Sequence, residues 1–194
     1  MKLLVLLAVV CAASAAAPRW PRLPKGWVPP DTKIVGGEDV DIRDYPYQVA
    51  MYYRGFFKCG GSIIGPNTIL TAANCIYGLE NFPSRFSIKY GVTDKTSSGK
   101  TAGVSKINVH DEYSGESVTN DIATMILSST IAYSETASAV MLAGTNSGTY
   151  AGEDAVVSGW GLTEEGNVSQ ERIFHEESIT CYGHTITAVR DRRL

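Results

Sequence analysis

The sequence predicts an all-β fold, because segments with strand-like alternation follow one another and turn residues separate them. Apolar and polar residues alternate over 86–90 and 105–109, and over 49–53 Val49, Met51 and Tyr53 alternate with Ala50 and Tyr52, which is typical of strands. Turn residues such as Gly55 and the Gly-Pro-Asn at 65–67 lie between such segments. Three further strands are expected at 62–64, 68–70 and 122–127, and no long amphipathic helix is apparent.

Length and charge limit the possible functions. The 194 residues suffice for one sizeable domain or two small ones, and the net charge of −3 comes without clusters of basic residues. We therefore expect no nucleic-acid partner. The sequence suggests no cofactor and no metal site.

The N-terminus has the pattern of a secretory signal peptide over 1–17. A positive charge at Lys2 precedes an apolar run from Leu3 to Val10 and a stretch of small residues. A membrane anchor is the alternative, but the run is well short of the ~20 residues that span a bilayer. We expect a secreted protein that makes no membrane contact.

Four sequence motifs together resemble those of the chymotrypsin/trypsin family of secreted serine proteases, and the sequence is similar in character to arthropod trypsins. They are Ile-Val-Gly-Gly at 34–37, Cys-Gly-Gly-Ser at 59–62, Leu-Thr-Ala-Ala-Asn-Cys at 70–75 and Ser-Gly-Trp-Gly at 158–161. The resemblance implies a double β-barrel, with a first barrel over 34–129 and a second barrel beginning in 130–194. It also implies that 18–33 is an activation propeptide, which a trypsin-like protease would cut between Lys33 and Ile34.

Asn74 departs from this family at the position of its catalytic histidine. A general base needs a lone pair that accepts a proton near neutral pH, and a carboxamide can only hydrogen-bond. Asp121 matches the aspartate that orients the histidine. With no imidazole to orient, we expect Asp121 to remain as a buried acceptor for the Asn74 amide. We do not expect His110, His175 or His184 to replace the base.

The cysteines give one expected bridge and one open question. The resemblance pairs Cys59 with Cys75, and the alternative of a zinc site lacks a CxxC or a histidine cluster. Removal of Cys11 with the signal peptide would leave Cys181 without an assigned partner. Asn167 begins an Asn-Val-Ser sequon and is a candidate for glycosylation.

The C-terminal third matches less well, and we expect the resemblance to fade after Gln170, with little stable structure beyond. The chain contains no Gly-Asp-Ser-Gly-Gly-Pro, so the nucleophile of the family is absent from it. We therefore expect a truncated second barrel with a divergent tail. Its uncovered apolar face would carry Trp160, Val156 and Ile173.

These observations predict a catalytically inactive serine-protease homologue. Whether it is an enzyme is left open, and no activity is the expectation. It would act as a binder or decoy toward protease inhibitors, substrates or other proteases. Two alternatives remain: a serine endopeptidase, as the domain resemblance alone would suggest, or an incomplete copy of a digestive protease without a function of its own.

Overall fold

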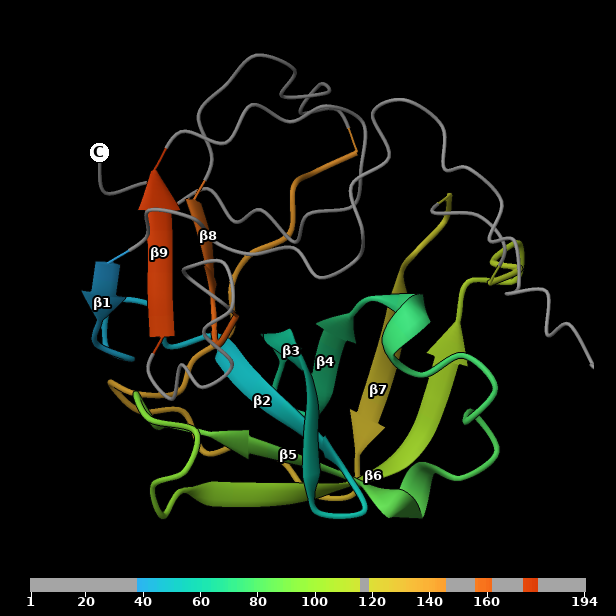
Figure 1. Cartoon of the computed structure of the whole chain (residues 1–194), viewed down its shortest axis with the longest axis horizontal. Helices are drawn as coiled ribbons and strands as arrows, with labels where there is room; N and C mark the ends of the chain where they lie inside the picture. The colour runs from blue at the N-terminus through green and yellow to red at the C-terminus, as the bar shows by residue number, and fades with distance from the viewer. Residues whose placement is uncertain (1–37, 116–118, 146–155, 162–172, 178–194) are drawn as a thin grey trace, which may run out of the picture. The chain divides into compact units, whose positions relative to one another are not determined.

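Six strands of the chain form a closed antiparallel barrel (Figure 1). The computed structural model describes residues 38–115, 119–145, 156–161 and 173–177. The barrel strands, in chain order, are β2 (Gln48–Tyr53), β3 (Phe56–Gly65), β4 (Thr68–Thr71), β5 (Phe86–Tyr90), β6 (Lys100–Val109) and β7 (Ala123–Leu127). They pair in the order β2-β3-β4-β7-β6-β5, and the ring closes because β5 pairs with β2. All six strands expected from the alternation are present, and the all-β prediction is confirmed.

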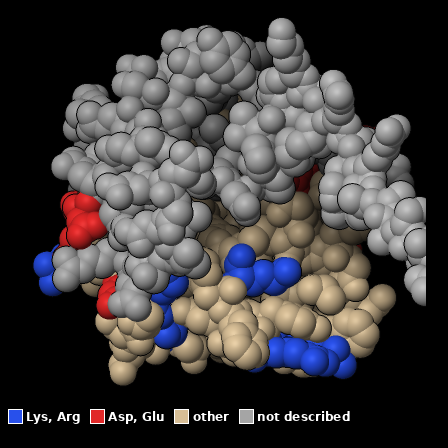
Figure 2. Space-filling model, in the orientation of Figure 1, with Lys and Arg blue, Asp and Glu red and all other residues tan. Residues whose placement is uncertain are grey.

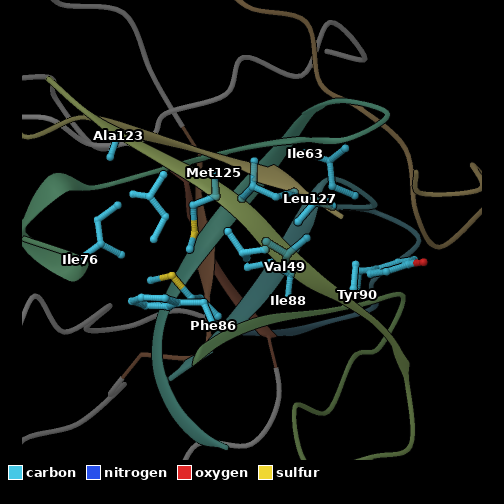
Figure 3. Close-up of a cluster of buried hydrophobic side chains, with 14 of the residues drawn as sticks. Val49, Ile63, Ile76, Phe86, Ile88, Tyr90, Ala123, Met125 and Leu127 are labelled. Carbon is cyan, nitrogen blue, oxygen red and sulfur yellow. The ribbon is translucent and has the colours of Figure 1, made fainter. Parts of the chain in front are cut away.

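The alternation of side chains decides which residues fill the barrel. In β5 and in β7, every second residue is buried, as one inward-facing row requires. The core contains Val49, Ile63, Phe86, Ile88 and Met125, each no more than 2 % exposed (Figure 3). Removal of such side chains from water contributes roughly 1.5–3 kcal/mol each to the free energy of folding.

A second, three-stranded sheet has the order β1-β9-β8. Its members are β1 (Glu38–Val40), β8 (Val156–Gly159) and β9 (Ile173–Glu177). Strand β9 lies in the segment where we expected little structure, so that expectation is wrong for its five residues. Glu38 and Ser158 both pair with His175, so β9 joins segments that are far apart in the sequence.

Trp160 follows β8 and is buried, which corrects the expectation that it lies on an uncovered face. Its side chain is 6 % exposed and packs with Ile42, Ala50 and Val92. Its Nε1–H donates to the carbonyl oxygen of Thr93 at 2.9 Å. Val156 is half-buried, and the side chain of Ile173 lies outside the described ones.

Helical structure in the described residues consists of two short 3₁₀ helices, η1 (Ala73–Cys75) and η2 (Pro83–Arg85). None of the helices in this part of the chain has the length and hydropathy of a membrane span. The signal peptide, the propeptide with Lys33 and Ile34, the sequon at Asn167, and Cys11 and Cys181 lie outside the described residues.

Candidate functional site

The strand pairing brings Asn74 and Asp121 together. Strands β4 and β7 are antiparallel neighbours, and Thr71 at the end of β4 pairs with Ala123 at the start of β7. Asn74 follows Thr71 by three residues, within η1, and Asp121 precedes Ala123 by two. The end of one strand and the beginning of the next therefore place both side chains at one edge of the barrel.

Asp121 accepts two hydrogen bonds from Asn74. The backbone N–H of Asn74 donates to Oδ1 at 2.7 Å, and its side-chain Nδ2 donates to Oδ2 at 2.5 Å. The carboxylate is only 8 % exposed, whereas Asn74 is exposed. This is the buried acceptor that we expected at Asp121. A carboxylate only accepts, so the amide must turn its nitrogen toward Asp121 and its oxygen away.

The local backbone orients Asp121. Asn120 has φ 59°, in the left-handed region that asparagine tolerates better than most residues. The N–H of Ile122 donates to the carbonyl of Asn120 at 2.7 Å, and the N–H of His110 donates to the carbonyl of Ile122 at 3.1 Å. These bonds tie the loop before β7 to the end of β6.

A disulfide holds the other side of the site. Cys59 in β3 and Cys75, the neighbour of Asn74, are bonded, with 6.2 Å between their Cα atoms. The sulfur atoms thus do not form the alternative zinc site. The hydroxyl of the buried Thr71 donates to the carbonyl of Gly60 at 2.9 Å. Together they hold the segment that carries Asn74 against β3.

Two tyrosines lie beside this pair, and the sequence patterns did not single them out. Tyr77 and Tyr113 make an edge-to-face contact, with ring centroids 5.2 Å apart. Burial raises the pKa of the Tyr113 phenol, and the negative charge of Asp121 raises it further. The negative charge of Asp121 therefore affects the ionisation of the Tyr113 phenol. Tyr113 lies 36 residues after Tyr77 and still further from the motif at 70–75, so no local pattern relates them.

His110 is not placed as a substitute base. It is exposed, and its Nδ1 accepts a hydrogen bond from the Glu112 N–H at 3.2 Å. His175 belongs to β9, and its side chain is not among the described ones; His184 lies outside the described residues. The carboxylate of Asp121 thus accepts two N–H groups from Asn74, and His110 supplies no imidazole to it.

Comparisons with known proteins place the chain in a family. The family model described as Trypsin matches residues 34–191. The match extends past Gln170, the point after which we expected the resemblance to fade. Trypsin alpha of Drosophila melanogaster is 36% identical over 171 residues, covering 87% of this chain and 63% of that protein. The vitellin-degrading protease of Bombyx mori is 34% identical over 136 residues, covering 70% of this chain and 51% of that protein.

A solved structure resembles the fold as well. The crystal structure of the scabies mite inactivated protease paralogue S-D1 has a TM-score of 0.67 and 28% identity, covering 74% of this chain and 61% of that one. The chain thus spans less than two thirds of the length of these relatives. With the closed barrel and the matched motifs, the comparisons show that this chain belongs to the trypsin-like serine protease family.

Proposed function

We propose that this trypsin-like chain binds other proteins and does not hydrolyse peptides. The observation that carries the proposal is the pairing of Asn74 with Asp121. The resemblance assigns these two positions to the base and the acid of the catalytic triad. The acid is retained, and the base is replaced by an amide.

The chemistry of that pair supports a non-catalytic role. A triad base takes the proton of the nucleophile and later returns it to the leaving group. The Asn74 amide donates through Nδ2 and has no lone pair of that basicity. Asp121 is buried with its two oxygens occupied by Asn74 donors, which leaves it poorly placed to act as a base itself.

The similarity to the scabies mite protein supports the same proposal. That protein is described as an inactivated protease paralogue, so a fold of this kind is found without proteolysis in that protein. The chain covers only 61% of that structure, so the absence of proteolysis in the present chain is a proposal.

We further propose that the protein is secreted and processed. The apolar N-terminus favours export, and the homologues are trypsins and a vitellin-degrading protease. A trypsin-like protease would cut between Lys33 and Ile34. Protease inhibitors, substrates or other proteases are the partner classes that a trypsin-like surface would bind.

The test is labelling by a fluorophosphonate probe after cleavage at Lys33–Ile34 with immobilised trypsin, together with an ester-hydrolysis assay. We expect neither label nor turnover, while trypsin treated in parallel gives both. Asn74→His is the matched variant. It restores an imidazole, but these 194 residues contain no Gly-Asp-Ser-Gly-Gly-Pro, so we expect this chain to stay inactive.

Labelling of the wild-type protein would overturn the proposal in favour of the serine endopeptidase alternative. Labelling of Asn74→His alone would show that some serine of the chain can serve as nucleophile. It would also show that Asn74 is the single defect.

A further inference from the structure

The β2–β3 hairpin ends in an exposed aromatic and cationic surface. We call it the hairpin-end patch and define it by Tyr53, Arg54, Phe56, Phe82 and Arg85. Arg54 and Gly55 form the tip with φ values of 52° and 86°, the left-handed pair typical of tight hairpin turns. The Arg54 N–H donates to the carbonyl of Arg85 at 2.8 Å, so the tip lies beside η2 at the same end of the barrel (Figure 1).

Two of the three aromatic side chains of the patch are exposed to solvent, and Tyr53 is half-buried. Phe56 is 79 % exposed and Phe82 is 41 % exposed. Phe56 lies opposite Tyr53 in the hairpin register, so their side chains share one face. A single exposed apolar residue is ordinary, but two phenylalanines around two arginines match the composition that protein interfaces favour.

Contacts within the patch hold both guanidinium groups over aromatic rings. Arg85 lies 4.2 Å from the ring centroid of Phe82, and Arg54 lies 5.7 Å from that of Tyr53. Arg85 also donates to the Tyr53 hydroxyl at 3.4 Å. These contacts limit the conformations of the two arginines, which reduces the entropy that a partner must offset when it binds them.

Acidic residues are scarce in the part of the sequence that forms the patch. Between residues 45 and 93, Glu80 is the single acidic residue, although the whole chain has a net charge of −3. Glu80 accepts the Gly78 N–H at 2.9 Å. Among the described residues, neither Arg54 nor Arg85 forms an ion pair. Figure 2 shows Lys and Arg side chains at the lower edge of this face.

The contacts with the two arginines also affect the ionisation of Tyr53. The hydrogen bond from Arg85 lowers the pKa of the Tyr53 phenol, burial partly opposes this, and the charges of Arg54 and Arg85 lower the pKa further. A surface that stabilises a phenolate would also stabilise a carboxylate placed beside it.

We propose that the hairpin-end patch is a docking surface for an acidic protein segment in which carboxylates flank an apolar side chain. The two arginines would take the carboxylates, and Phe56 and Phe82 would cover the apolar residue. A sulfated polysaccharide would need a longer row of cations and would leave both rings unused. The proposal names a partner chemistry for the binding role proposed above, at a surface separate from Asn74.

The experiment measures fluorescence anisotropy of a short fluorescein-labelled peptide in which glutamates flank a central leucine. We expect saturable binding to the full chain that weakens with salt, and no binding of the same peptide with lysine in place of glutamate. Charge reversal in Arg54→Glu/Arg85→Glu should weaken binding by about tenfold or more, because two attractions become repulsions. Phe56→Ser should weaken it by about threefold or more with the charges intact.

The matched control is Arg43→Glu/Lys100→Glu, which makes the same change in net charge at exposed sites outside the patch. Lys100 pairs with Tyr90, at the opposite end of β5 from Arg85. We expect unchanged peptide binding in the control. Circular dichroism would verify that each variant folds, and exposure of the replaced side chains makes misfolding unexpected.

Three outcomes would overturn the proposal. An equal loss of binding in the control would mean that net charge alone attracts the peptide. If Phe56→Ser did not change peptide binding and heparin bound more tightly than the peptide, the patch would be a surface for polyanions in general. Patch-dependent binding to phosphatidylserine vesicles without binding to the peptide would identify a membrane surface. Each outcome is independent of the hydrolysis assay, so the docking surface and the loss of catalysis can fail separately.

Discussion

Replacement of Asn74 by aspartate should convert the central contact of the site from attraction to repulsion. In Asn74→Asp, a carboxylate would take the place of the Nδ2 donor that lies 2.5 Å from Asp121 Oδ2. Two unit charges about 4 Å apart interact by about 1 kcal/mol in water and about 4 kcal/mol at the effective dielectric of a protein surface. Because Asn74 is exposed, solvent screening and side-chain rotation place the expected repulsion near the lower value, at about 1–2 kcal/mol.

The comparison with Asn74→Ala separates repulsion from the simple loss of a hydrogen bond. Both variants lose the Nδ2 bond, which costs about 1 kcal/mol at an exposed position, and both keep the backbone N–H bond to Asp121. We therefore expect the free energy of unfolding at pH 7 to fall by about 1 kcal/mol in Asn74→Ala. In Asn74→Asp it should fall by about 2–3 kcal/mol.

The pH dependence supplies a second test of the same reasoning. Repulsion raises the folded-state pKa of the coupled pair above the unfolded value of about 3.9. The extra destabilisation of Asn74→Asp is then complete above the raised pKa and is relieved as the pH falls through it toward 3.9. Urea denaturation of both variants at pH 7 and pH 4 measures this. Equal stabilities of the two variants at both pH values would refute the proposed contact.

Three further predictions concern other parts of the chain. Replacing Cys59 and Cys75 by alanine should lower the free energy of unfolding by about 3 kcal/mol, measured by urea denaturation, because the bridge closes a loop of 16 residues. Trp160→Ala should accelerate hydrogen exchange of the β8 amides but not of the barrel amides; equal acceleration of both would contradict it. Arg85→Ala should raise the pKa of Tyr53 toward its ordinary value, observed by NMR of ¹³C-labelled tyrosine. The lowered pKa stabilises the fold only at alkaline pH, so this effect should not change stability at pH 7.

Local patterns sufficed for the barrel because its strands are short and their inner faces are apolar. The alternation at 86–90 and the fuller apolar run at 122–127 predicted strands, and both segments contain strands with every second residue buried. β9 carries apolar residues without such alternation, and its order comes from pairing with β1 and β8, which no local pattern encodes. The family resemblance located Asn74 and Asp121, and the register of β4 with β7 explains why they meet.

Trp160 shows why burial of the second sheet escaped sequence reasoning. Its neighbours Ile42, Ala50 and Val92 come from a turn, a barrel strand and a loop, and its hydrogen-bond acceptor Thr93 precedes it by 67 residues.

The contacts of Trp160 and Ser158 also explain how β8 is held to the barrel. Ser158 Oγ donates to Oε1 of the buried Gln48 at 2.8 Å. Thr93 accepts two hydrogen bonds, one from the Trp160 Nε1–H at its carbonyl oxygen and one from the Ile42 N–H at its Oγ1, at 3.1 Å. The groups in these contacts belong to β2, to the turn before it (Ile42) or to the loop after β5. These contacts bury one large aromatic side chain against the barrel and satisfy the polar groups beside it. Asn74 lies in η1, after β4, and takes part in none of these contacts, so the attachment of β8 to the barrel does not depend on the residue at this position.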